Sequence, residues 1–331
     1  MKKSLIALAV LGAAAGVAQA QSNVTIYGVT DIGYAKDTGS KLRMDENVSN
    51  RLGFMGQEDL GGGLKAIFQL EERYKLFNGK EKSAANSRGV FEGAANVGLK
   101  GNFGQVRFGR VNELSTETLR KLDPFNQDGV AAMPDNIFRG NDQEGRLSST
   151  TRYDSPVYNG FQFGATYTIK NQSKSTLGYL PAKADNGEHA YSNDGWALNG
   201  TYTNGPLYLI ANYNKVVDSN DSFNWNIGAA YAFGPAKISL GYEQTKDKLY
   251  TDAKEKRYLV GLTYNIGAGM IKASYNHSDN INFSDEAGKQ WAVGYTHNLS
   301  KRTSIYVDYA HVSQDHADSV NSYMVGMTHK F

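Results

Sequence analysis

The sequence predicts an all-β fold, a sixteen-stranded antiparallel transmembrane β-barrel. Three observations predict it: an export leader at the N-terminus, repeated segments in which apolar side chains alternate with polar or small ones, and connections that alternate between short turns and long polar loops. Only every second residue of a barrel strand contacts lipid, so a mean hydropathy of −0.50 is compatible with a chain that spans a membrane.

The first part of the chain, residues 1–20, has the three-part layout of a secretory signal peptide. A short basic region (residues 2–3) precedes an apolar run over residues 5–17, and residues 18–20 (Ala-Gln-Ala) supply small side chains where a signal peptidase cuts. The apolar run is too short for a membrane anchor, and polar sequence follows it at once. We therefore expect residues 1–20 to be removed and residues 21–331 to form the barrel.

Composition excludes several classes of protein. Basic and acidic residues nearly balance (Lys+Arg 35, Asp+Glu 33), which argues against nucleic acid as a partner. Cysteine is absent, so neither disulfides nor thiolate metal sites hold the chain together. A closed barrel, in which each backbone N–H and C=O pairs with a neighbouring strand, would stabilise an exported chain of this size without them. We expect no cofactor and no metal.

Period-two alternation recurs along the chain, for example over residues 64–71, 225–233 and 258–266. Aromatic residues at both ends of the apolar stripes favour a membrane barrel over a pair of β-sandwiches. Sixteen strands fit between the connections, and an even number brings both termini to one side of the membrane. The strands are expected to begin near residues 23, 48, 64, 91, 104, 148, 161, 193, 207, 222, 236, 256, 270, 289, 303 and 321.

The connections alternate in length as they do in outer-membrane barrels. Short ones carry the Gly, Pro, Asn or Ser that tight turns need, and the long polar ones include residues 36–46, 77–90 and 171–192. The longest, residues 111–147, follows the fifth strand, and a loop of that length in a compact chain is usually functional or disordered. Its apolar residues give it the means to pack against another surface.

The last strand places Tyr323, Val325 and Met327 on one face and ends in Phe331. His329 interrupts this apolar stripe, which a position at the membrane interface would explain. An alternating strand with a C-terminal phenylalanine is similar to the signal that the barrel assembly machinery reads. We expect Phe331 to serve as that assembly signal.

Five motifs, in order along the chain, resemble the general porins of Gram-negative bacteria, most closely the neisserial and β-proteobacterial branch. They are residues 23–28 (Asn-Val-Thr-Ile-Tyr-Gly), 51–66 (beginning Arg-Leu-Gly-Phe-Met-Gly), 104–110 (Gly-Gln-Val-Arg-Phe-Gly-Arg), 152–156 (Arg-Tyr-Asp-Ser-Pro) and 298–303 (Asn-Leu-Ser-Lys-Arg-Thr). The resemblance implies a homotrimer in the outer membrane, surrounded by its lipid and lipopolysaccharide. It also implies a third loop folded inward, here residues 111–147, which narrows a passive, water-filled channel for ions and small hydrophilic solutes.

The width and the electric field of the narrowest ring determine what a pore passes. The long loop carries acidic residues that would form one side of that field: Glu113, Glu117, Asp123, Asp128, Asp135, Asp142 and Glu144. Family position suggests three basic residues on the opposite side: Arg51, Arg110 and Arg146.

Alternation supports an inward Arg51, because Leu52 and Phe54 take the lipid face. Arg110 has the parity of the apolar positions before it, so its inward orientation requires the strand to bend. Three further basic residues have inward parity and could line the lumen wall: Lys65, Arg73 and Arg107. Alternatively, the arginines pair with loop acids and only hold the loop in place.

One departure from the family bears on selectivity. Relatives in this branch place an arginine in the fourth strand, where this chain reads Phe-Glu-Gly-Ala-Ala-Asn over residues 91–96 and has Glu92 beside the gap. The resemblance implies a preference for anions, and the missing charge weakens it. We expect a weak preference for anions.

The sequence fits three other functions less well. An enzyme would need a catalytic constellation, and the chain has neither a Gly-x-Ser-x-Gly elbow nor a His-Glu-x-x-His pattern among its 6 histidines. A substrate-specific porin would need an aromatic track, for which only Tyr208 and Tyr306 have the right parity. A surface adhesin on a barrel scaffold would not need a long inward loop. Loop carboxylate pairs such as Asp142 with Glu144, or Asp218 with Asp221, are candidates for calcium but are more often solvated.

Overall fold

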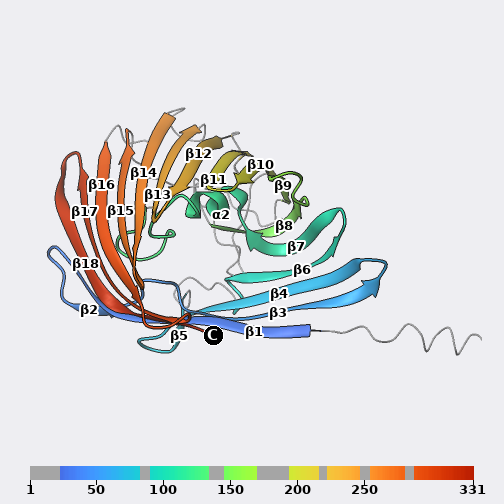
Figure 1. Cartoon of the computed structure of the whole chain (residues 1–331), viewed down its shortest axis with the longest axis horizontal. Coiled ribbons are helices and arrows are strands. Elements are labelled where there is room, and N and C mark those ends of the chain that lie inside the picture. The colour runs from blue at the N-terminus through green and yellow to red at the C-terminus, as the bar shows by residue number, and fades with distance from the viewer. Residues whose placement is uncertain are drawn as a thin grey trace, which may run out of the picture.

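The computed structural model describes residues 23–82, 90–133, 145–169, 194–215, 222–246, 254–279 and 287–331. Most of them are in β-strands, which curve around one interior (Figure 1). No helix within these ranges is long and apolar enough to cross a membrane. The predicted leader, Asp135, and both candidate calcium pairs lie outside the described residues.

Sixteen long antiparallel strands form the barrel, with two short ones, β2 (Arg43–Asp45) and β5 (Lys80–Glu81), beside them. The long strands of the first half are β1 (Asn23–Asp37), β3 (Arg51–Gly61), β4 (Leu64–Lys75), β6 (Ala94–Gly101), β7 (Gly104–Asn112), β8 (Arg146–Asp154), β9 (Phe161–Thr168) and β10 (Gly195–Asn204). Those of the second half are β11 (Leu207–Lys215), β12 (Phe223–Phe233), β13 (Ala236–Lys246), β14 (Lys254–Ile266), β15 (Gly269–Ser278), β16 (Gly288–Asn298), β17 (Thr303–Gln314) and β18 (Ala317–Lys330). The predicted fold class and strand number are confirmed.

The ring closes at β1, which pairs with strands from both ends of the chain. Its first half is antiparallel to β3, from Asn23 opposite Gln57 to Val29 opposite Arg51. Its second half is antiparallel to β18, from Val29 opposite Lys330 to Asp37 opposite Ser322. Because each strand has a neighbour on both sides, the barrel leaves no open sheet edge, as a membrane requires.

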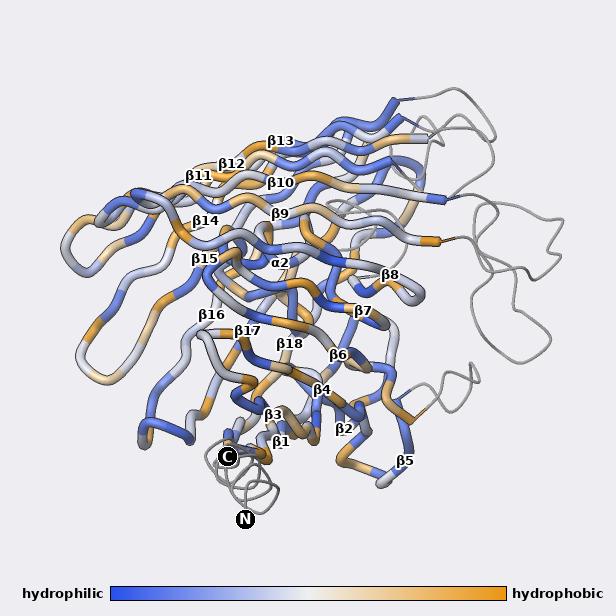
Figure 2. The backbone as a smooth tube through the Cα atoms, turned by 90° about the vertical axis from the view of Figure 1, so that its right-hand side faces the viewer, coloured by the Kyte–Doolittle hydropathy of each residue, from blue (hydrophilic) through white to orange (hydrophobic). Residues whose placement is uncertain are grey.

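Alternation separates an outer apolar face from an inner polar one. On β12 the outward residues Ile227 and Tyr231 are exposed, whereas the inward Asn224 and Asn226 are fully buried. Figure 2 shows this pattern as repeated changes between hydrophilic and hydrophobic colours along the strands. Outward aromatic rings on neighbouring strands contact one another, as in Trp225–Tyr242 with ring centroids 5.2 Å apart. Such rings suit the interface between lipid and water.

The last hairpin differs from the prediction. The final strand begins at Ala317 rather than near Asn321, because a two-residue turn, Asp315-His316, joins it to β17. His316 has a φ of 60°, in the left-handed region that such tight hairpin turns use. Residues 317–320 therefore continue the pairing with β17 and are not part of the connection.

Candidate functional site

The segment that follows β7 contains the one helix in the described residues, α2 (Leu114–Arg120), which lies inside the ring of strands (Figure 1). Glu113 caps its N-terminus: its carboxylate accepts hydrogen bonds from the Thr116 backbone N–H (2.8 Å) and the Ser115 hydroxyl (2.6 Å). Capping satisfies backbone donors that a helix start leaves open, so this acid stabilises the turn into the helix.

Apolar side chains of residues 114–133 pack on the inner wall. Leu119, Leu122 and Met133 form a buried cluster with wall residues of three strands: Ile210, Ala230 and Leu259. Phe125 packs in the same way on Ala292 and Ala310.

Glycines on the wall make room for this segment. A Cβ at Gly228 would lie 2.2 Å from a Leu122 methyl group, and one at Gly261 would lie 2.8 Å from Pro124. A Cβ at Gly294 would lie 2.9 Å from the Phe125 ring. The wall is therefore shaped to receive the segment.

Polar contacts fasten the segment to the same wall. The Lys237 ammonium donates to the Lys121 carbonyl (3.2 Å), and the Gln290 amide donates to the Ala132 carbonyl (2.9 Å). The Asn212 amide donates to the Thr118 hydroxyl of α2 (2.9 Å). Contacts from β11, β13 and β16 thus hold residues 118–132 in place.

A cavity of about 270 Å³ lies where the segment faces the opposite wall. Besides neutral residues, five arginines and one carboxylate line this cavity: Arg51, Arg73, Arg107, Arg120, Arg146 and Glu71. Arg51 and Arg73 are directly opposite in the β3–β4 register, and Arg120 comes from the end of α2. The side chains in this cavity therefore carry a large excess of positive charge.

Two of these arginines form ion pairs with neighbouring carboxylates. Arg73 forms an ion pair with Glu71 (2.7 Å), and Arg107 forms one with Asp154 (2.9 Å). The other three, Arg51, Arg120 and Arg146, form no ion pair with a carboxylate within the described residues. They lie in the same cavity, so their charges act on whatever enters it.

The predicted loop acids occupy different environments. Glu117 accepts hydrogen bonds from the Arg152 guanidinium (2.6 Å) and the Asn112 amide (2.7 Å). Burial acts to raise the pKa of Glu117, but the Arg152 charge outweighs it and holds that pKa below its ordinary value.

Asp123 is buried and does not line the cavity. Its carboxylate accepts from the backbone N–H groups of Phe125 (3.0 Å), Gln127 (2.8 Å) and Met133 (3.2 Å), so it organises the turns after α2. Burial raises its pKa. Asp128 is half-buried and lies within electrostatic range of Arg51.

The remaining predicted residues lie as follows. Arg110 donates to the Glu92 carbonyl (2.7 Å) and the Ser148 hydroxyl (2.9 Å), and it is not among the residues that line the arginine cavity. Lys65 lies opposite Lys100 in the β4–β6 register, at the barrel end with the short turns.

The C-terminal residue closes the seam of the barrel. The Phe331 N–H donates to the Gly28 carbonyl (3.1 Å), and the Gly28 N–H donates to the Phe331 carbonyl (3.1 Å). The last residue therefore completes the pairing between the two ends of the chain.

Two charged residues in this region were not predicted. Arg120 belongs to a helix, where strand alternation gives no information about orientation. Arg152, in contrast, lies in a strand and within a family motif. Alternation along that strand would have placed Arg152 inward, as it placed Arg107. In the structure the two arginines are opposite each other in the β7–β8 register.

A closed antiparallel barrel with a helical segment packed on its inner wall and charged residues around an internal cavity defines a membrane channel. Residues 7–317 match the Gram-negative porin family, and the chain belongs to it. The fold and family indicate a channel rather than an enzyme, located in the bacterial outer membrane.

Individual relatives agree with this assignment. Outer membrane porin protein 32 of Delftia acidovorans is 36% identical over 283 residues, covering 78% of this chain and 75% of the relative. An outer membrane porin protein of Bordetella pertussis is 32% identical over 284 residues, covering 75% of this chain and 70% of the relative.

Solved structures share the fold. An anion-selective porin from Comamonas acidovorans superimposes with a TM-score of 0.79 at 27% identity, covering 94% of this chain and all of the other. The trimer form of OmpT from Vibrio cholerae, at 16% identity, has a TM-score of 0.70 and shows the fold alone.

Proposed function

We propose that this porin is a general diffusion channel that prefers anions, and that residues 111–147 with the facing arginines form its narrowest region. The observation that carries the proposal is the arginine cavity, in which five guanidinium groups surround one carboxylate. Rings of charged side chains set the ion preference of a pore. The anion selectivity in the name of the Comamonas acidovorans relative supports the same sign.

The pairing within the cavity explains why the preference is for anions. Arg73 and Arg107 are balanced by neighbouring acids, so they contribute mainly a local dipole. Arg51, Arg120 and Arg146 contribute net charge. Opposite unit charges a few ångströms apart attract by about 1 kcal/mol even at the dielectric constant of bulk water. Three such charges are enough to favour an anion over a cation severalfold.

Arg120 supplies a charge beside the gap in the fourth strand. The family places an arginine in residues 91–96, and this chain has none there. Ala94, from that segment, lines the same cavity as Arg120. A helix residue that lines the same cavity thus stands in for the missing strand residue, which is why the loss need not reverse the selectivity.

The acids divide by function. Glu117 and Asp128 contribute negative charge near the lumen, whereas Glu113 and Asp123 stabilise the backbone of the inward segment. We propose that Asp135 belongs to the constriction, as the family position implies. Arg110 fastens β7 to its neighbours. Arg73 and Arg107 line the cavity as ion pairs with Glu71 and Asp154, and Lys65 adds positive charge to the lumen wall near the short turns.

The assembled protein is proposed to be a homotrimer in outer-membrane lipid and lipopolysaccharide. The signal peptide directs export, and Phe331 is read by the barrel assembly machinery. The pairing of Phe331 with Gly28 at the seam supports a role for the last residue in closing the barrel. The solutes are ions and small hydrophilic molecules.

Planar bilayer recording tests the proposal. The purified protein should insert in events of three equal conductance steps, and the reversal potential under a KCl gradient should have the sign of chloride preference. A potassium preference would overturn the assignment of selectivity. Insertion without conductance would overturn the channel itself and favour an adhesin on a barrel scaffold.

A further inference from the structure

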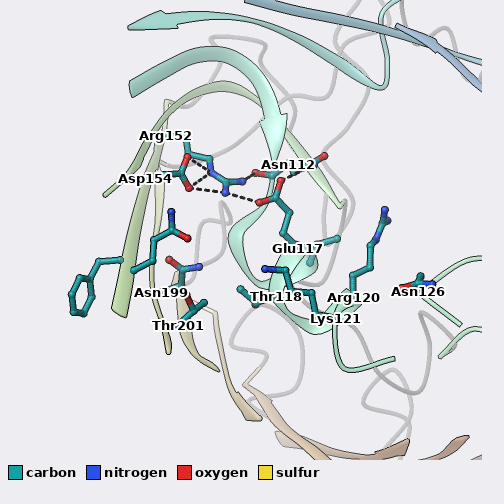
Figure 3. A pocket seen from close by; sticks show the side chains of 13 residues that line it. Asn112, Glu117, Thr118, Arg120, Lys121, Asn126, Arg152, Asp154, Asn199 and Thr201 are labelled. Carbon is teal, nitrogen blue, oxygen red and sulfur yellow. Dashed lines mark hydrogen bonds and ion pairs between the residues drawn. The ribbon is translucent and has the colours of Figure 1, made fainter. Parts of the chain in front are cut away.

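A second cavity, of about 380 Å³, lies between α2 and the inner faces of β8, β9 and β10 (Figure 3). It shares Asn112 and Arg120 with the arginine cavity, so the two are adjacent. Its volume is within the range of small-molecule sites in proteins, about 300–1,000 Å³. A solute in the lumen would meet this cavity beside the arginine cluster.

The acidic residues of this second cavity are already engaged. The Arg152 guanidinium donates to Glu117 (2.6 Å) and to Asp154 (2.7 Å), and to the Asn112 carbonyl (2.9 Å). Arg107 also pairs with Asp154 (2.9 Å). Figure 3 shows the contacts of Arg152 with Glu117, Asp154 and Asn112 gathered at one end of the cavity. No free carboxylate among the described lining residues remains to bind an ammonium group.

The rest of the lining offers two kinds of open group. The helix side presents the cations Arg120 and Lys121, neither of which pairs with a described carboxylate; the Lys121 ammonium lies 5.0 Å from the Tyr208 ring centroid. The strand side presents the neutral side chains of Asn199 and Thr201, which make no hydrogen bond to any described residue. Gln162, beside them, uses its NH₂ group on the Ser155 carbonyl (3.1 Å), which leaves its own carbonyl oxygen open.

We propose that this cavity is a binding subsite for small polyhydroxylated carboxylates, the class of sugar acids. The carboxylate of the solute lies toward Arg120 and Lys121, and its hydroxyl groups exchange hydrogen bonds with Asn199, Thr201 and Gln162. A hydroxyl is both donor and acceptor, which matches amide and hydroxyl side chains. The inference rests on the proposed anion-preferring channel and names a class of solute for it.

Size and charge discriminate against other occupants. The cavity would hold roughly a dozen water molecules at about 30 Å³ each, about the number of non-hydrogen atoms in a six-carbon sugar acid. An inorganic anion would leave the amide wall unused. An amino acid would bring its ammonium group to a cavity in which both carboxylates already form ion pairs and the remaining charges are positive. A neutral sugar could accept hydrogen bonds from the two cations but would gain no charge attraction from them.

Block of the chloride current by added solutes tests the subsite. Sodium glucuronate, sodium acetate and glucose are each added to the full protein in a planar bilayer. For each solute we measure the half-effect concentration, at which block of the current, or the excess current noise, reaches half its maximum. We expect this concentration to be at least about fivefold lower for glucuronate than for acetate or glucose. Equal values for glucuronate and acetate, or for glucuronate and glucose, would overturn the proposal.

A wall variant, Asn199→Ala with Thr201→Val, separates this subsite from the arginine cavity. It should raise the half-effect concentration for glucuronate about fivefold or more, because each lost hydrogen bond weakens binding by a factor of about two to ten. Thr203→Val, at the next inward position of the same strand and outside the cavity lining, is the matched control and should change nothing.

The KCl reversal potential distinguishes failure of the subsite from failure of the proposed function. The wall variant removes no charge, so its chloride preference and conductance should equal those of the wild type, which also shows that the barrel is intact. An unchanged glucuronate effect in the wall variant contradicts the subsite even if chloride preference persists. Loss of chloride preference in the wild type itself would instead contradict the proposed function.

Discussion

Replacing Arg146 with glutamine removes one of the three cavity arginines that have no carboxylate partner within the described chain. The arginine cavity has a volume of about 270 Å³. An ion at the centre of such a space lies roughly 6 Å from a guanidinium on its wall, and two unit charges at that distance in water interact by about 0.7 kcal/mol. At 0.1 M salt the Debye length of about 10 Å reduces this to about 0.4 kcal/mol.

The substitution weakens the attraction of the anion and the repulsion of the cation together. The difference between the two ions therefore falls by about 0.8 kcal/mol, and Arg146→Gln should lower the chloride-to-potassium permeability ratio about three- to fourfold at 0.1 M KCl. At 1 M KCl the Debye length is about 3 Å, and the change should be less than about twofold.

The assay is the reversal potential of single channels under a fixed KCl gradient, repeated at low and high salt. Glu71→Gln is the control of opposite sign, since it adds a net positive charge to the same cavity and should raise the ratio. Lys41→Gln changes an exposed residue of the β1–β3 connection and should leave the ratio unchanged. An equal fall at both salt concentrations, or no fall at either, would refute the electrostatic reasoning.

Three further predictions concern the inward segment and the seam. Arg152 holds the pKa of Glu117 below its ordinary 4.5, so Glu117 is ionised and fastens α2 at all pH values above 4.5. The ion pair with Arg152 is lost only as the pH falls through the lowered pKa. Single-channel conductance should therefore be equal at pH 7 and pH 5 and change only in more acidic solution, and Glu117→Gln should lack that acid transition. Leu122→Ala removes a fully buried anchor, a change that costs about 2–5 kcal/mol in a packed core, so open-channel current noise should increase; Leu198→Ala, on the lipid face, should not increase it. Deletion of Phe331 should lower the amount of protein in the outer membrane severalfold on quantitative immunoblots, and normal levels would show that the last residue is not the assembly signal.

The barrel itself could be predicted from the sequence because its pattern is local. Side chains alternate with a period of two, so one apolar residue fixes the orientation of its neighbours along a strand. Alternation thus placed Arg51, Arg73 and Arg107 on the inner face, where all three line the arginine cavity. The same rule applied to Arg152 would have found the residue that holds α2.

The inward segment could be predicted only in part, because its contacts join residues distant in sequence. Leu122 was recognisable as an apolar residue in a long polar loop, but nothing local identifies Gly228 as the wall position that leaves space for Leu122, or Gly261 as the one that leaves space for Pro124. Acidic residues in the loop were expected around the pore. Asp123 instead satisfies backbone N–H groups, a role that depends on the turn geometry and not on the residue type.

The location of a bound anion tests the central claim most directly. In a crystal of the full protein soaked in sodium bromide, anomalous diffraction would show where bromide concentrates. We predict a strong bromide site in the cavity between Arg51, Arg120 and Arg146, and its loss in Arg146→Gln. Bromide bound elsewhere in the lumen, with this cavity empty of it, would contradict the claim that these arginines set the selectivity.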